Sequence, residues 1–307
     1  MEHIYDVIIV GGGPAGYSAA LYTSRAGLDT LVVEKAAPGG QMALTDIIDN
    51  YPGFSDGVDG FTLGMNMQSG AERFGAKTEY AEITAVDFAD KIKKLNTPTG
   101  VLLSKAVIIA TGADPRRLGI DGENNLIGKG LHYCAHCDGR FYKNKTVTVI
   151  GGGNSAVSDA LYLSNLCAKV ILIHRRDTLR ATKIYHEPLM KAKNVEFIWD
   201  SVITDYIFDD RVTGVKVKNL KSGAEGEIHC DGVFVSIGRE PVTSVFKGHI
   251  ELDSGGYIVA GESTTTNVDG VFAAGDVRTK VLRQVITAAA DGAVAAHYTE
   301  EYLLQQA

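Results

Sequence analysis

The sequence predicts an α/β protein with two three-layer domains, the second inserted into the first. A pattern of apolar strand, glycine turn, amphipathic helix and second apolar strand occurs twice, at residues 5–35 and 145–176. Each copy is followed by hairpin-rich sequence and a further apolar strand, ending near Gly112 or Gly238. A third such strand, at residues 270–277, has no glycine turn of its own, so we assign it to the first domain.

The elements follow from these repeats. The first copy predicts a helix from about Pro14 to Ala26 and a strand that ends at Glu34; the second copy has the same spacing, from Gly151 to His174. A final helix is expected from about Gln284 to Leu304. Residues 1–114 and 242–307 would form the first domain and residues 115–241 the second. A proline near each crossing fits a defined pair of hinges.

Composition limits the function. The chain has 307 residues, 45% of them hydrophobic, and a formal net charge of −7 without a long basic run, which argues against nucleic acid as its partner. The N-terminus has no charged leader, and its apolar run is too short for a membrane span, so a cytoplasmic protein is expected. Four cysteines are too few for a disulfide scaffold, and a close CxxC pair then suggests redox catalysis or metal binding.

The first glycine turn predicts a dinucleotide site. Gly11, Gly13 and Gly16 form GxGxxG, in which the glycines permit a tight turn, close approach of a pyrophosphate and close helix packing. Glu34 ends the second strand, where a carboxylate accepts hydrogen bonds from ribose hydroxyls and repels a 2′-phosphate. Asp276 follows the third strand and could hold a ribityl hydroxyl. The economical assignment is FAD.

The second glycine turn predicts a different dinucleotide. Gly151 and Gly153 are followed by Ala156 in the third position, a tolerated variant. The strand after this turn ends in basic residues, and guanidinium groups bind a phosphate through forked hydrogen bonds. The arginines Arg175, Arg176 and Arg180 therefore predict NADPH rather than NADH.

The stretch "YCAHCDG" carries the chemistry. Cys134 and Cys137 can close a small ring reversibly, and Asp138 could move protons during exchange. Zinc is the alternative, since His132 and His136 lie beside the thiols, but a structural zinc usually takes ligand pairs from two separated segments. No metal is therefore expected. The other two cysteines, Cys167 and Cys230, are interpreted as core thiols.

The motifs together resemble the low-molecular-weight thioredoxin reductases over almost the whole chain. They are "GGGPAGYSAALY", "GGQM" followed by "NYPGF", "CAHCDG", "GGGNSAVSDALYL", "HRRDTLRA", and "GVFAAGDV" leading into "RQVITAAADG". The resemblance implies two Rossmann-like domains in a homodimeric FAD protein. It would take hydride from NADPH, reduce its own CxxC disulfide and then reduce a thioredoxin disulfide.

The resemblance also implies roles for individual residues. Cys137 would lie next to the flavin, Cys134 would attack the partner disulfide, and Asp138 would donate or accept the proton. The FAD contacts would be Gly11, Gly13, Pro14, Ala15, Gly16, Glu34, Lys35, Gly40, Gln41, Asn50, Thr111, Gly112, Gly275, Asp276, Arg283, Gln284 and Val285. The NADPH contacts would be Gly151, Gly153, Asn154, Ser155, Ala156, His174, Arg175, Arg176 and Arg180.

Three positions depart from the usual family pattern. His136 lies inside CxxC, where a protonated imidazole would favour a thiolate, although a neutral surface histidine is an equal alternative. Arg140 follows the DG pair, where many relatives have an aromatic residue that helps seat thioredoxin, so the protein partner is open. Leu282 is a milder departure near the flavin.

Other functions stay open at this point. The same fold could reduce another thioredoxin-like or glutaredoxin-like protein, take electrons from ferredoxin, or act as a dithiol oxidase; the intact second turn and its arginines argue against the last two. The flavoprotein subunit of a hydroperoxide reductase shares this fold but has an additional N-terminal domain, whereas here the flavin strand is expected to start at about Ile4. A zinc-stabilised nucleotide-binding sensor is the non-enzymatic alternative. In the reductase reading, we expect the inserted domain to rotate about its two crossings between half-reactions.

Overall fold

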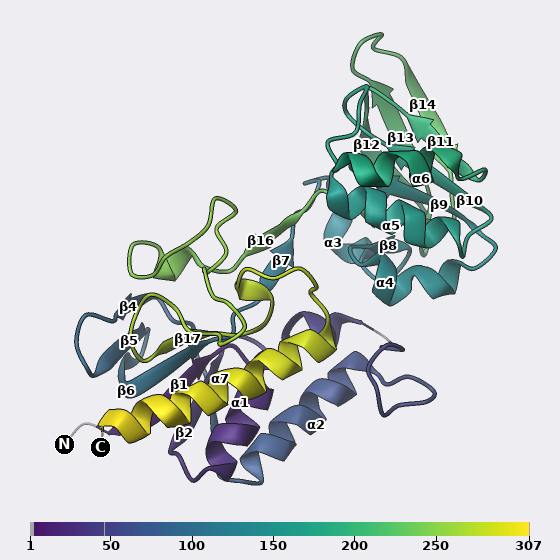
Figure 1. The fold of residues 1–307 in the computed structure, drawn as a ribbon. Helices are drawn as coiled ribbons and strands as arrows, with labels where there is room; N and C mark the ends of the chain where they lie inside the picture. The colour runs from purple at the N-terminus through teal and green to yellow at the C-terminus, as the bar shows by residue number, and fades with distance from the viewer. Residues whose placement is uncertain (1–2, 46, 307) are drawn as a thin grey trace. The chain divides into compact units, whose positions relative to one another are not determined.

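The computed structural model describes residues 3–45 and 47–306, and the chain divides into two compact units (Figure 1). Unit 1 consists of Met1–Asp114 and Glu240–Ala307, and unit 2 consists of Pro115–Arg239. The α/β class that the sequence predicted is confirmed, because both units contain a parallel sheet with helices.

Unit 1 is built on a seven-stranded sheet. The strand order is β3-β2-β1-β6-β5-β4, with β17 paired to β6. Strands β1, β2, β3, β6 and β17 run parallel, and β4, β5 and β6 form an antiparallel meander. The strands are β1 (Ile4–Val10), β2 (Thr30–Glu34), β3 (Lys77–Tyr80), β4 (Ala85–Asp87), β5 (Lys93–Thr97), β6 (Gly100–Ile109) and β17 (Val271–Ala273).

The residues of β1 show why this sheet is buried on both faces. Val7 and Ile9 pack into one apolar cluster with α1 (Pro14–Arg25) and α7 (Val285–Gln306). Ile8 and Val10 point the other way, into a cluster that includes Phe246. Successive side chains of a strand face opposite sides, so an unbroken apolar run is what a doubly covered strand requires. The remaining helices of unit 1 are α2 (Gly60–Glu72), η1 (Gly40–Leu44), η4 (Ser244–Phe246) and η5 (Gly275–Val277).

Two helices of unit 1 approach each other closely. A Cβ atom on Gly292 of α7 would lie 2.9 Å from the Ala19 nitrogen and would also meet the Ala15 carbonyl oxygen of α1. Only glycine allows this contact, and the small residues of "AAADG" in α7 serve the same purpose. Helix α7 therefore packs directly over the helix that follows the first glycine turn (Figure 1).

Unit 2 repeats the arrangement with a smaller sheet. Its five parallel strands have the order β11-β10-β9-β15-β8, and a three-stranded antiparallel sheet, β12-β13-β14, follows in sequence. The strands are β8 (Leu131–His132), β9 (Thr146–Ile150), β10 (Lys169–Ile173), β11 (Val195–Ile198), β12 (Ser201–Phe208), β13 (Val212–Asn219), β14 (Glu225–His229) and β15 (Gly232–Val235). The helices are α3 (Glu123–Leu126), α4 (Ala135–Asp138), η2 (Gly139–Tyr142), α5 (Asn154–Ser164), η3 (Lys183–Tyr185) and α6 (His186–Lys191).

The two crossings between the units are short strands. They are β7 (Ala113–Pro115) and β16 (Arg239–Pro241), which pair as a two-stranded sheet. The chain returns to unit 1 at Glu240, two residues before the division at 241/242 that the sequence predicted. The pairing of β16 with β7 explains the difference. Pro241 lies inside this paired strand, so it does not mark the end of the inserted unit. Within the described residues, no helix has the length and apolarity to cross a membrane.

Candidate functional site

The first glycine turn joins β1 to α1 and leaves an open cradle. Gly11 has φ +106°, and a Cβ there would lie 2.5 Å from the Ala110 carbonyl oxygen, so the turn requires glycine. A Cβ on Gly13 would meet nothing within 4 Å, and no side chain caps the start of α1. The free N–H groups of a helix start bind phosphate, so this turn fits the pyrophosphate of a dinucleotide.

Glu34 lies beneath this turn at the end of β2. Its side chain is buried, and its two carboxylate oxygens accept hydrogen bonds from the Gly12 N–H at 2.6 Å and the Ala36 N–H at 2.9 Å. The adjacent Lys35 is exposed and pairs with Glu82 at 2.7 Å. Glu34 is thus held in one orientation at the edge where a ribose would lie, whereas Lys35 makes a surface contact.

The other predicted FAD contacts follow strands β6 and β17 or belong to nearby loops of the same unit. The Thr111 hydroxyl donates to the Val242 carbonyl at 2.7 Å. The Gln41 amide donates to Asp114 at 2.7 Å, and the Asn50 amide donates to Gln284 at 2.9 Å. Ligands of open parallel sheets bind at the carboxyl ends of the strands, so these positions surround the edge at which the Gly11 turn lies.

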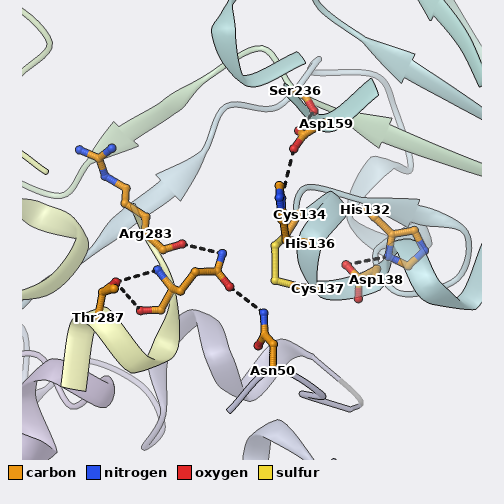
Figure 2. Close-up of a disulfide and its surroundings, with 11 residues drawn as sticks. Asn50, His132, Cys134, His136, Cys137, Asp138, Asp159, Ser236, Arg283 and Thr287 are labelled. Atoms are coloured by element: carbon orange, nitrogen blue, oxygen red, sulfur yellow. Dashed lines mark hydrogen bonds and ion pairs between the residues drawn. A yellow bond between two sulfur atoms is a disulfide. The ribbon is translucent and has the colours of Figure 1, made fainter. Parts of the chain in front are cut away.

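Arg283 is held by its own unit. Its guanidinium carbon lies 4.1 Å from the centroid of the Tyr257 ring, and it donates to the carbonyl oxygens of Asp276 and Arg278. Figure 2 shows Arg283 on the segment that leads into α7, next to the hydrogen bonds that Thr287 makes there. Arg283 therefore fixes the turn that contains Asp276.

A buried ion cluster supports this turn from below. Asp291 of α7 accepts two hydrogen bonds from Arg278, at 2.8 and 2.7 Å, and one from Lys280 at 2.8 Å. The same carboxylate accepts the Gly275 N–H at 2.9 Å. Burial opposes ionisation, but the bonds from Arg278 and Lys280 lower the pKa of Asp291. The cluster thus fixes Gly275 at the carboxyl end of β17.

The second glycine turn joins β9 to α5 in unit 2. Gly151 has φ +138°, and a Cβ there would lie 2.5 Å from the Ser236 carbonyl oxygen and 2.8 Å from the Ala156 methyl group. A Cβ on Gly153 would meet nothing within 4 Å, and no side chain caps α5. This turn has the same open cradle as the first, despite alanine in its third position.

The arginine loop is tied back to this turn. The Arg180 N–H donates to the Gly152 carbonyl at 2.7 Å, and the Asn154 side chain accepts the Thr182 N–H at 2.8 Å. Arg175, Arg176 and Arg180 are all exposed. The structure thus places a basic, solvent-accessible loop beside the second cradle, where a 2′-phosphate would need it.

His174 lies under the second turn rather than facing solvent. A Cβ on Gly152 would lie 2.5 Å from its ring, and its Nε2 atom is buried without a hydrogen-bond partner among the described residues. Burial, together with the charges of the three nearby arginines, lowers the pKa of His174. The imidazole is therefore neutral at pH 7 and adds no charge beside the cradle.

Cys134 and Cys137 form a disulfide with a Cα–Cα distance of 5.3 Å (Figure 2). Cys134 precedes the short helix α4, and its carbonyl accepts the N–H groups of Cys137 and Asp138 at 3.3 and 3.1 Å. Both cysteines are half-buried and follow β8. The dithiol and the second glycine turn thus lie in one unit.

Two histidines pair with two carboxylates around the disulfide (Figure 2). His132 Nδ1 lies 3.1 Å from Asp138 Oδ2, and both side chains are largely buried. His136 Nδ1 lies 3.8 Å from Asp159 Oδ1, and the His136 ring stacks on Tyr162 at 4.3 Å. The two histidines thus contact separate carboxylates, which differs from a shared zinc site.

The described residues do not provide the set of ligands that a zinc site would require. Among the described residues, no group of three histidine, cysteine or acidic side chains could hold a metal ion. The expectation for the other two cysteines is confirmed, since Cys167 and Cys230 are buried. Burial raises the pKa of Cys167 to about 11 and also raises that of Cys230. Neither thiol is therefore reactive at neutral pH.

Sequence reasoning missed three supporting groups. Asp159 and Ser236 contact the dithiol region through His136; Asp159 lies within the motif "GGGNSAVSDALYL", but nothing in that motif links it to a residue of the CxxC segment, and Ser236 lies far from both along the chain. Asp291 carries a signal that could have been used: it is an acid within a run of small apolar residues, "TAAADGA", which suggests a buried charge with a partner.

Comparison with known proteins gives consistent matches. The family model for pyridine nucleotide-disulphide oxidoreductases matches residues 5–292. A curated thioredoxin reductase from Listeria monocytogenes is 46% identical over 303 residues, covering 98% of this chain and 95% of that protein. The crystal structure of thioredoxin reductase from Streptococcus pyogenes has a TM-score of 0.92 at 40% identity and covers 99% of this chain and 100% of that one. Lactococcus lactis thioredoxin reductase in its "FR conformation" has a TM-score of 0.70 at 41% identity, with 98% and 99% covered.

Proposed function

Because the chain belongs to the pyridine nucleotide-disulphide oxidoreductases, and within them to the thioredoxin reductases, we propose that it reduces a thioredoxin disulfide with NADPH. The balanced reaction is NADPH + H⁺ + thioredoxin disulfide → NADP⁺ + thioredoxin dithiol. The observation that carries the proposal is the Cys134–Cys137 disulfide in the same unit as the second glycine turn. A sensor that used the cysteines for zinc would have no need of a disulfide.

Unit 1 would hold FAD. The open cradle at Gly13, the oriented Glu34 carboxylate and the fixed Gly275 turn fit the pyrophosphate, adenosine ribose and ribityl chain respectively. When bound, FAD supplies a two-electron carrier between nicotinamide and disulfide. The protein's part is to fix these groups on rigid strand ends, and the ion pair of Asp291 with Arg278 serves that purpose from inside the unit.

Unit 2 would bind NADPH. The cradle at Gly153 fits the pyrophosphate, and the exposed arginine loop fits a 2′-phosphate. The neutral, buried His174 supports the floor of the turn without a charge of its own.

The dithiol would pass its electrons on by exchange. As the resemblance implies, the Cys134 thiolate would attack one sulfur of the substrate disulfide, and the other substrate sulfur would leave with a proton. The Cys137 thiolate would then attack Cys134, which releases the second substrate thiol and restores the enzyme disulfide. Asp138 is the nearest carboxylate in sequence to Cys137 and would accept and return protons.

We also propose that the two units rotate between half-reactions. Two relatives of nearly equal identity, 40% and 41%, differ in TM-score, 0.92 against 0.70, although both are covered almost completely. One rigid body would superpose about equally well on both relatives, so the difference supports more than one arrangement of the units within the family. A covalent crosslink between the units should stop turnover and leave one half-reaction, and undiminished turnover would contradict the idea.

One experiment tests the central proposal. The purified protein is mixed anaerobically with NADPH or NADH while flavin absorbance is followed, and the host's thioredoxins and glutaredoxins are then added singly. NADPH should bleach the flavin, and one thioredoxin should restore the colour. The Cys134→Ser variant should still bleach but should reduce no thioredoxin. A protein that is not bleached by NADPH would overturn the proposal, and reoxidation by a glutaredoxin alone would change its substrate.

Assembly and location are part of the proposal. A homodimer rests on the family resemblance, and a cytoplasmic location rests on the low cysteine count and the reactive CxxC pair. Sedimentation of the flavin-loaded protein tests the first, and fractionation of the host cell tests the second.

A further inference from the structure

His132 lies at the centre of a buried chain of polar groups behind the disulfide. Its Nδ1 atom is 3.1 Å from Asp138 Oδ2, and its Nε2 atom is 2.7 Å from the Tyr142 hydroxyl. Arg211 approaches the same hydroxyl at 3.5 Å. His132 is 7% exposed and Tyr142 is 2% exposed, so water does not substitute for these contacts.

The fold fixes these groups from several elements. His132 ends β8 and stacks on Phe234 of β15 at 5.3 Å, while Asp138 ends α4. Tyr142 ends η2, and a Cβ on Gly232 would clash with its ring, so the phenol packs directly against the backbone of β15. The titratable and charged groups that face His132 and Tyr142 are Asp138, Arg211, the buried thiol of Cys230, and Lys145, whose Nζ atom lies 5.6 Å from the centroid of the Tyr142 ring.

The donors and acceptors in this series of polar groups determine the direction of each hydrogen bond. Arg211 can only donate, so the Tyr142 oxygen accepts from it and the Tyr142 O–H is left to donate to His132 Nε2. Nδ1 then carries the imidazole proton and donates it to Asp138. Burial raises the pKa of Tyr142, so the phenol keeps its proton. Each hydrogen bond in this series then joins one donor to one acceptor.

We propose that His132 is a positioning residue for the dithiol chemistry, whose Nδ1–H holds the Asp138 carboxylate in one orientation. This inference rests on the proposed function, in which Asp138 accepts a proton from a cysteine thiol and returns it to a departing sulfur. The bond from Nδ1–H fixes where the carboxylate lies relative to Cys137, from which it would take the proton.

Two substitutions at His132 separate positioning from packing. The amide nitrogen of asparagine can replace Nδ1, and that of glutamine can replace Nε2. His132→Asn therefore keeps a donor toward Asp138, and His132→Gln keeps a hydrogen-bonding group only toward Tyr142. His229→Asn, on an exposed residue of the same unit, is the matched control.

The first readout is the pH dependence of iodoacetamide alkylation in flavin-loaded protein reduced with dithiothreitol. We expect the pH profile of His132→Gln to differ from that of the parent, because the carboxylate next to Cys137 has lost the donor that orients it. His132→Asn and His229→Asn should keep the parent profile. An unchanged profile in His132→Gln would overturn the proposal.

The second readout measures the protonation of His132 in the parent protein itself. Nitrogen-15 spectra of labelled histidines in the parent protein report which ring nitrogen carries the proton, and the signal missing from His132→Asn assigns His132. A protonated Nδ1 supports the inference, and an unprotonated Nδ1 overturns it. Neither readout uses NADPH or thioredoxin, so a failure of the proposed function would leave both results interpretable.

Discussion

The Nδ1 atom of His136 lies 3.8 Å from Oδ1 of Asp159, while the Ser236 hydroxyl donates to the other oxygen of Asp159 at 2.5 Å. Burial raises the pKa of Asp159, and the bond from Ser236 and the charge of His136 oppose that rise. The histidine inside CxxC thus has an acidic partner on α5, held in place by Ser236.

The first prediction concerns the dithiol potential. Asp159→Asn removes the carboxylate that pairs with the His136 imidazole, and so should weaken the stabilisation of a nearby thiolate by that imidazole. Because a stabilised reduced form makes a dithiol more oxidising, the variant should be more reducing, by about 10–20 mV. A redox titration of the flavin-loaded protein against glutathione measures the shift. Asp210→Asn, an exposed carboxylate of the same unit, is the control and should show none. An equal potential in the two variants would show that Asp159 does not act on the thiols.

The second prediction concerns nucleotide preference. Arg175→Gln combined with Arg176→Gln should reduce kcat/KM for NADPH by about 10- to 100-fold, since each charge-assisted bond to a 2′-phosphate is removed. Activity with NADH should change little. Stopped-flow bleaching with each nucleotide gives both values. Lys183→Gln, an exposed cation of the same unit, provides the comparison, and an equal loss with NADH would assign the arginines a structural role.

The third prediction concerns flavin retention. Glu34→Gln replaces one carboxylate oxygen with an amide that cannot accept the Gly12 N–H or a ribose hydroxyl at that atom. We expect FAD affinity to fall about 10-fold or more. Equilibrium dialysis of the apoprotein gives the dissociation constant. Glu82→Gln, which removes an exposed ion pair with Lys35, should retain full affinity.

The fourth prediction concerns stability and pH. The folded pKa of Asp291 is lowered from 3.8 because Arg278 and Lys280 hydrogen-bond to its carboxylate against the effect of burial. Its stabilising contribution is therefore complete above the unfolded pKa and is lost as pH falls through the folded pKa. Asp291→Asn should cost about 3–5 kcal/mol at pH 7, because two buried cations lose their carboxylate.

Urea unfolding of unit 1, followed by flavin release, measures this loss. The difference between parent and Asp291→Asn should shrink as the pH falls below about 4, the pKa of Asp291 in the unfolded chain, and should be lost once the folded carboxylate is also protonated. Glu301→Gln changes an exposed acid of the same helix and should shift the free energy of unfolding by less than about 0.5 kcal/mol. A difference that does not depend on pH would mean that the Asp291 charge contributes nothing.

Much of the fold could be predicted because local patterns determine it. Strands β1 and β9 are buried on both faces, and Gly11 and Gly151 adopt positive φ angles that only glycine adopts readily. Helix α7 runs over Val285–Gln306, close to the expected Gln284–Leu304. The end of the inserted unit was less certain, since pairing of β16 with β7 decides it and no local pattern shows that pairing.

The sequence by itself determined the two glycine turns, the acid and the arginines that distinguish them, and the CxxC pair, because each acts through neighbours at fixed spacing along one strand or turn. The tertiary structure decided which distant side chains support them. Asp159 reaches His136 from α5, Asp291 reaches Gly275 from α7, and Tyr142 reaches His132 across the end of a sheet. Such contacts depend on how elements pack, and packing brings together residues whose separation in sequence carries no periodic signal.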